Sequence, residues 1–135
     1  MRLAAAALAV VVAAFFGARL HDHDRCDDTR RAIFRATLGG GPAPEDAVDR
    51  IRESCRGTAA LVAVAGALHA QGRDTDAARL AREAKDSEPD NAAAWRALAV
   101  TAQAPAEARA AAERLAELDP LAARSLNLNA GRSTR

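Results

Sequence analysis

The sequence has very few aromatic residues: no tyrosine, one tryptophan and three phenylalanines among 135 residues. Half of the chain is nevertheless apolar, so its core has to be built from alanine, leucine and valine. Such side chains favour close-packed helices over a β-sandwich, because β-branched and aromatic residues are scarce outside the N-terminus. The composition therefore predicts an all-α fold, and the length allows one domain, or one small domain with an appendage.

The sequence also lacks an excess of charge of either sign. Its formal net charge is +1, with arginines and acidic residues interspersed along the chain. A general nucleic-acid binder would show a basic stripe or a strongly basic domain. We therefore expect no nucleic-acid partner.

Motifs of known catalytic chemistry are missing as well. No Ser-His-Asp order and no nucleophile elbow appear, and the glycine run 39–41 lacks the Lys and Ser/Thr of a phosphate loop. An acid–base role for His69 would need a carboxylate or nucleophile positioned against it, and no motif supplies one. The sequence predicts a protein without catalytic activity and without a cofactor.

A short stretch after the N-terminus contains residue types that bind zinc or copper: His21, Asp22, His23, Asp24 and Cys26. It lacks the paired spacing of a structural zinc site, in which separate elements each supply two ligands. We interpret it as a solvated polar hinge and expect no metal site.

One long apolar run is present, at residues 3–18, with Arg2 before it and Arg19 after it. Its length of about 16 residues lies between a signal-peptide core of about 7–15 and a membrane span of about 17–25. Cleavage after Ala18 would place Phe16 at a position that requires a small residue. We therefore predict that residues 1–20 form an uncleaved single-span anchor, with a signal cleaved after Ala14 as the alternative.

The orientation of this span is left open by two opposing patterns. Arginines follow the span more densely than they precede it, which by the positive-inside rule places the rest of the chain in the cytoplasm. The two cysteines, Cys26 and Cys55, favour an exported domain if they form a disulfide.

Glycine and proline divide the remaining residues, 21–135, into helical hairpins at about 24–57, 58–91 and 92–120. In the first hairpin, Cys26 starts one helix and Cys55 ends the other, so an antiparallel pairing brings them together. We predict a disulfide there; the alternative is two buried free thiols in a reducing compartment. A short helix over about 121–128 is expected to cap the last hairpin through its apolar residues: Leu121, Ala122, Leu126 and Leu128.

The second and third hairpins share a pattern of residues. The second contains Leu61-x-x-Val64-Ala65-x-x-Leu68, Ala77-x-x-x-Ala81, Ala84 and Pro89. The third contains Trp95-x-x-Leu98-Ala99-x-x-Ala102, Ala108-x-x-x-Ala112, Leu115 and Pro120, with its proline at the same distance from its alanines. This pattern resembles the tetratricopeptide repeat, a helical hairpin of about 34 residues.

The resemblance implies a stack of hairpins whose first helices line a concave groove for a peptide or partner helix. The first hairpin matches only in architecture, and alanine replaces the large aromatic residues of the motif at Ala81, Ala102 and Ala112. Smaller residues are expected to bring the helices closer and to leave less buried area per repeat. A four-helix bundle without repeats is the alternative fold.

Aligned on the motif, six positions face the groove: Val62, Gly66, His69, Arg96, Val100 and Gln103. The family's carboxylate clamp has polar side chains where Val62 and Gly66 stand, so such a clamp is not expected here. The groove suits a short apolar or weakly acidic segment, with Arg96 as its charged anchor. We predict a membrane-anchored or exported interaction module with a protein partner. The alternative function is a homodimeric, membrane-anchored structural assembly. The alternative interpretation of the six groove positions is that their side chains only cover the inner face of a small stack and bind nothing.

Overall fold

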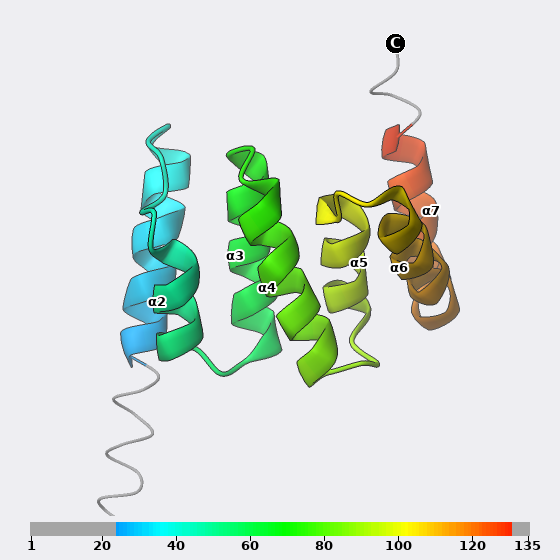
Figure 1. Cartoon of the computed structure of the whole chain (residues 1–135), viewed down its shortest axis with the longest axis horizontal. Helices are drawn as coiled ribbons and strands as arrows, with labels where there is room; N and C mark the ends of the chain where they lie inside the picture. The colour runs from blue at the N-terminus through cyan, green and yellow to red at the C-terminus, as the bar shows by residue number, and fades with distance from the viewer. Residues whose placement is uncertain (1–23, 131–135) are drawn as a thin grey trace, which may run out of the picture.

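The structure is a computed structural model that describes residues 24–130, and regular structure in this range is entirely helical (Figure 1). The prediction of an all-α fold is confirmed. The helices follow one another along the chain as the first helix (residues 24–38), α2 (Ala47–Ser54), α3 (Thr58–Ala70), α4 (Asp74–Ser87), α5 (Ala92–Thr101), α6 (Pro105–Leu118) and α7 (Pro120–Ala130).

Local chemistry explains where the helices start and stop. Gly40 and Gly72 adopt φ angles of 71° and 74°, a left-handed conformation that glycine reaches without strain, and each follows the end of a helix. Pro105 stands at the first position of α6, where the missing N–H is not needed. Asn91 caps α5, because its side-chain oxygen accepts a hydrogen bond from the Ala93 N–H at 3.0 Å.

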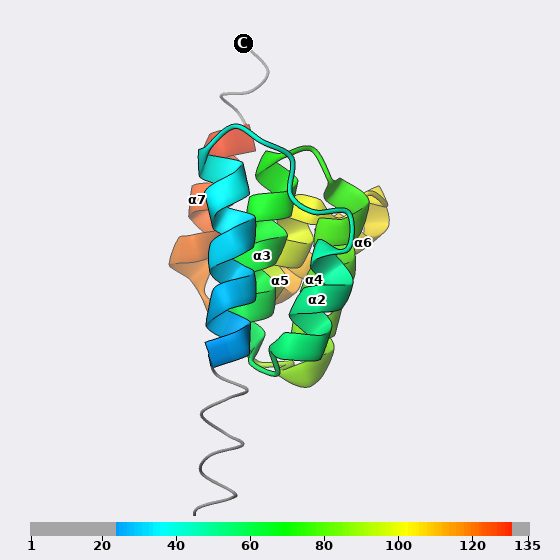
Figure 2. The ribbon, with the colours of Figure 1, turned by 90° about the vertical axis from the view of Figure 1, so that its left-hand side faces the viewer.

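Successive helices run antiparallel and form hairpins that lie side by side along the long axis of the molecule (Figure 1). Seen along that axis, the first helix, α3 and α7 lie on one side, and α2, α4 and α6 lie on the other (Figure 2). α3 contacts α5 directly as well as α4, so the first helices of neighbouring hairpins are in contact. This arrangement places one face of α3 beside one face of α5.

The buried core divides into two clusters of different size. The larger cluster runs from the first helix to the start of α5 and contains most of the large side chains, among them Ile33, Ile51 and Leu80. The smaller cluster contains Leu98 with two alanines, Ala81 and Ala111, and Trp95 packs against it. The hairpin formed by α5 and α6 has fewer large buried side chains than the hairpin before it, so it is held by less hydrophobic burial.

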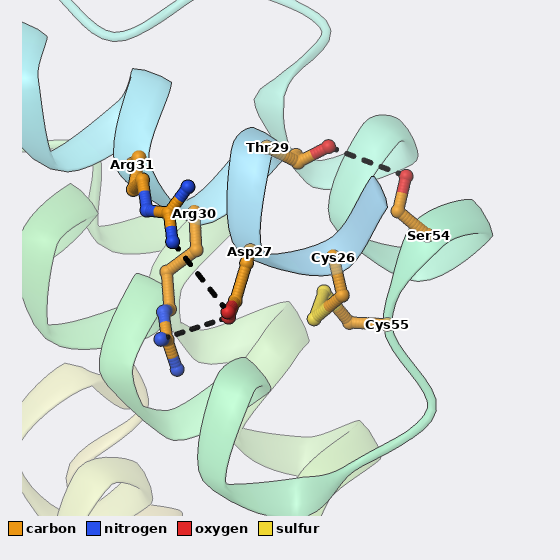
Figure 3. The surroundings of a disulfide bond; sticks show 7 residues. All are labelled: Cys26, Asp27, Thr29, Arg30, Arg31, Ser54 and Cys55. Atoms are coloured by element: carbon orange, nitrogen blue, oxygen red, sulfur yellow. Dashed lines mark hydrogen bonds and ion pairs between the residues drawn. A yellow bond between two sulfur atoms is a disulfide. The ribbon is translucent and has the colours of Figure 1, made fainter. Parts of the chain in front are cut away.

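A disulfide joins the two ends of the first hairpin (Figure 3). The Sγ atoms of Cys26 and Cys55 are 2.06 Å apart, and their Cα atoms 4.8 Å apart, which confirms the predicted bridge. Beside it, the Thr29 hydroxyl donates a hydrogen bond to Ser54 Oγ at 3.3 Å. The first helix and α2 are therefore linked both covalently and by hydrogen bonding at this end.

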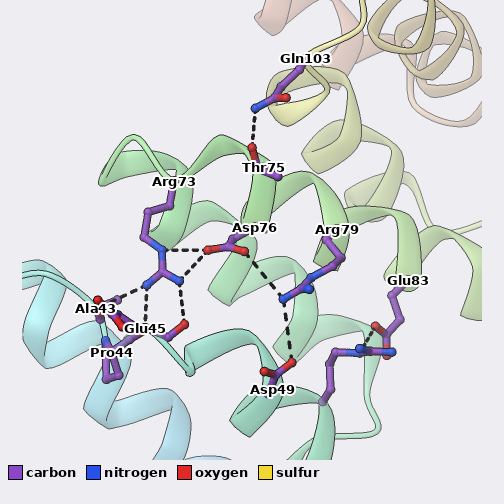
Figure 4. A network of polar contacts seen from close by, with 11 residues as sticks. Ala43, Pro44, Glu45, Asp49, Arg73, Thr75, Asp76, Arg79, Glu83 and Gln103 are labelled. Carbon is purple, nitrogen blue, oxygen red and sulfur yellow. Dashed lines mark hydrogen bonds and ion pairs between the residues drawn. The ribbon is translucent and has the colours of Figure 1, made fainter.

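The turn between α3 and α4 holds the loop that precedes α2. The Arg73 guanidinium donates hydrogen bonds to the carbonyl oxygens of Ala43 and Pro44 at 3.1 and 2.8 Å (Figure 4). The Gln71 side chain accepts a hydrogen bond from the Ala43 N–H at 2.9 Å and donates one to the Gly41 carbonyl at 3.0 Å. These bonds satisfy the backbone of an irregular loop and attach the first hairpin to the second.

A charged pair links α4 to α6 on the outer side. Arg82 donates hydrogen bonds from Nε and Nη2 to the two carboxylate oxygens of Glu107, at 2.6 and 2.7 Å. These bonds to the charged form hold the pKa of the Glu107 carboxyl below its usual value. The stabilisation is therefore present at neutral pH and is lost as the pH falls through that lowered pKa, and its size is modest because the pair is largely exposed.

Two predictions concern the ends of the chain. The apolar run at residues 3–18 lies outside the described residues, and between residues 24 and 130 no helix is both long and apolar enough to cross a membrane. The expected capping helix exists as α7, which packs on α6. The prediction that Leu121 faces the last hairpin is wrong, because this side chain is 74% exposed at the start of α7.

Candidate functional site

A shallow depression of about 280 Å³ lies between α3 and α5. Its lining is mostly aliphatic, and it comes from the faces that the two helices present side by side. The lining residues are Val62, Gly66 and His69 from α3, and Ala93, Arg96, Ala97, Val100 and Thr101 from α5.

Five of the six groove positions named from the sequence are brought together in this depression: Val62, Gly66, His69, Arg96 and Val100. The sixth, Gln103, is not part of the lining. It follows the end of α5, and its Nε2 donates a hydrogen bond to the Thr75 hydroxyl at 2.7 Å (Figure 4). Gln103 therefore ties α5 to the start of α4 outside the depression.

Three lining residues on α5 were missed by the sequence reasoning: Ala93, Ala97 and Thr101. They are spaced four residues apart, so they form one stripe along the helix, next to Arg96 and Val100. That spacing is the signal that identifies them. Thr101 is 3% exposed, and its hydroxyl donates to the Ala97 carbonyl at 2.8 Å, so this hydroxyl is already used within α5.

His69 has a carboxylate partner that the sequence reasoning did not find. Its Nδ1 lies 2.5 Å from Asp74 Oδ1, across the turn between α3 and α4. No sequence motif indicated this carboxylate neighbour of His69. The pairing orients the imidazole ring and engages Nδ1, which leaves Nε2 as the ring nitrogen available to a ligand in the depression.

Arg96 is the only fully charged side chain in the lining. Neither α3 nor α5 contains an acidic residue. Within residues 24–130, no carboxylate forms an ion pair with Arg96, whereas most other arginines on α2, α4 and α6 have such partners. The depression is thus an apolar surface with one exposed cation and no anion of its own.

The polar stretch near the N-terminus is only partly described, since residues 21–23 lie outside the described range. Cys26, the thiol of that stretch, is bonded to Cys55. A disulfide sulfur is not a thiolate, so Cys26 does not serve as a metal ligand in this state.

The fold and the site define an all-α protein of antiparallel hairpins with an apolar depression between its central helices. No protein-family model, curated protein or solved structure matches this chain. Within the lining, the Thr101 hydroxyl is hydrogen-bonded inside α5, and Asp74 orients the His69 ring. The lining contains no thiol and no free hydroxyl that could act as a nucleophile. The chemistry that this lining offers is apolar contact, one cation and one hydrogen-bonding ring.

Proposed function

We propose that the chain is a tetratricopeptide-like interaction module that binds a short apolar segment of a protein partner in the depression between α3 and α5. The observation that carries the proposal is the exposed apolar surface around a single unpaired arginine. The bound segment carries one carboxylate, which pairs with Arg96. The carboxylate that pairs with Arg96 comes from the bound segment, because neither α3 nor α5 contains an acidic residue.

The repeat character is supported by the packing of equivalent residues. Ala65 and Ala81, at positions where the motif has glycine and a large aromatic residue, are both fully buried. Ala65 packs in the larger core cluster, and Ala81 packs with Leu98 of α5 and Ala111 of α6 in the smaller one. The first helices of the second and third hairpins then lie next to each other, which is the arrangement that creates a groove in repeat proteins.

We also propose that the domain is held at a membrane by residues 3–18, or exported, and that it works outside the cytoplasm. The disulfide supports this compartment, because disulfides persist in oxidising environments and are rare in the cytosol. Mass spectrometry of the protein from its native host, alkylated under non-reducing conditions, is expected to find Cys26 joined to Cys55. Recovery of both cysteines as alkylated free thiols would contradict the proposed compartment.

Binding is testable with peptides, because the partner is defined here by its chemistry. A phage library of random 16-residue peptides, selected on the full chain in detergent, is expected to enrich apolar sequences that contain one Asp or Glu. Synthetic peptides of this kind should lose at least about tenfold in affinity for Arg96→Glu, since the substitution places like charges together. Fluorescence anisotropy measures the affinity.

Arg109→Glu is the matched control, because Arg109 is an exposed arginine on α6, outside the depression. This variant should bind the peptides as the original protein does. Equal binding by Arg96→Glu and the original protein would contradict the proposal. If the library yields no binder, and the full chain instead forms dimers that Val100→Glu abolishes, the occupant is a second copy of this chain.

A further inference from the structure

Gly66 stands in the floor of the depression, in the middle of α3. We infer that the bound segment is an α-helix whose backbone crosses α3 directly over Gly66. The inference rests on the proposed function and specifies the form of the partner. It is carried by two observations: a helical glycine that the fold does not need, and a lining with few hydrogen-bonding groups.

The backbone at Gly66 does not call for glycine. Positive φ angles among the described residues occur at Gly40 and Gly72, and Gly66 has ordinary helical geometry. Glycine in a helix interior destabilises the fold relative to alanine. The chain thus carries a less stable residue at the centre of α3.

Packing inside the chain does not call for glycine either. A Cβ built on Gly66 meets no heavy atom within 4 Å, so alanine fits there without any adjustment. Alanine is the small residue everywhere else in α3, at six positions. The space above Gly66 is therefore open to a partner, and the missing Cβ lets a second backbone come closer than alanine would allow.

The hydrogen-bonding groups of the lining favour a helix over an extended peptide. An extended segment buries N–H and C=O groups that need partners, and each one left unpaired weakens binding by its desolvation cost. The lining offers only Arg96 and the free nitrogen of His69, since the Thr101 hydroxyl is already bonded. A helix satisfies its own backbone, so apolar contact and one ion pair suffice.

The surrounding side chains describe the complementary face of that helix. Besides Gly66, Ala93 and Ala97 line the depression with short side chains, and Val62 and Val100 line it with larger aliphatic ones. A helix with a small residue at the crossing point and aliphatic residues a turn away matches this shape. Its carboxylate reaches Arg96 from the edge of the same face.

The form of the bound peptide is tested with the peptides selected on the full chain. A selected peptide should gain helical circular dichroism on binding, after subtraction of the protein spectrum. An analogue with proline at its central position should lose at least about tenfold in affinity, because proline interrupts a helix interior. An analogue with proline outside the apolar stretch is the control and should bind normally.

Gly66→Ala tests the contact from the protein side. It should raise the Tm of the free protein by about 4 °C, because alanine is the better helix former. It should also lower the affinity of the protein for the selected peptides by about tenfold, because the added Cβ overpacks the point where the two helices cross. Gly57→Ala is the control for binding, since a Cβ there also meets open space but lies outside the depression, and this variant should bind the peptides as the original protein does.

The outcomes separate this inference from the proposed function. Peptides that depend on Arg96 but tolerate the central proline and Gly66→Ala overturn the helix and leave the binding function in place. A library without any peptide that depends on Arg96 overturns the proposed function, and the inference with it. Loss of affinity on both substitutions, together with a higher Tm for Gly66→Ala, supports the inference.

Discussion

Replacing Cys26 and Cys55 together by alanine is expected to lower the free energy of unfolding by about 3–4 kcal/mol. The two residues are 29 positions apart, and closing a loop of this size removes conformational entropy from the unfolded chain. Alanine avoids placing a hydroxyl at residue 55, which is buried in the core. Urea unfolding followed by far-ultraviolet circular dichroism measures the effect.

The first hairpin depends on this bond because its second helix is short. α2 has eight residues, and a helix of that length is unstable on its own. The original protein treated with a thiol reductant is the control and should match the double variant. A double variant within about 1 kcal/mol of the oxidised protein would show that packing alone holds the hairpin.

Leu80→Ala is expected to cost about 2–5 kcal/mol in the free energy of unfolding. Leu80 is fully buried in the larger core cluster, and the other buried residues of α4 are all alanines. Its removal leaves a cavity in a cluster that also contains large side chains such as Ile51 and Leu68. The cost is measured by the same urea titration.

Val100→Ala is the matched control for this substitution. Val100 is 41% exposed at the depression, so truncating it removes little buried area. Its effect on unfolding should stay below about 1 kcal/mol. A Leu80→Ala variant as stable as Val100→Ala would contradict the burial of Leu80 in the larger core cluster.

The helices could be predicted from the sequence because their ends depend on local chemistry. Gly72 turns the chain after the end of α3 through its own left-handed backbone conformation, and Pro105 suits the first turn of a helix whatever surrounds it. The disulfide followed from the helices, since antiparallel pairing places Cys26 beside Cys55. The positions facing the depression followed from the resemblance to the tetratricopeptide motif, since aligning the chain on that motif named five of the residues that line it.

Contacts that depend on the path of a turn could not be predicted. His69 and Asp74 are five residues apart, a spacing that pairs side chains only because the turn between α3 and α4 folds back. Arg73 reaches the loop before α2 across about 30 residues of sequence, and nothing in a periodic pattern reports such a contact.

Two positions close to helix ends were placed wrongly from the sequence. Leu121 stands in the first turn of α7, where the chain direction changes, and its side chain faces solvent. Gln103 follows the last residue of α5 and turns toward Thr75 on α4. For Gln103 the motif alignment was carried past the end of α5, and for Leu121 the apolar residue type alone was taken to indicate burial.

The central claim is that Arg96 anchors a carboxylate of the bound segment, and a charge exchange tests it most directly. The affinity of one selected peptide, with its acidic residue kept or replaced by lysine, is measured for the original protein and for Arg96→Glu. We predict that the lysine peptide binds the original protein at least about tenfold more weakly and recovers most of that loss on Arg96→Glu. A lysine peptide that binds Arg96→Glu no better than the original protein would contradict the claim.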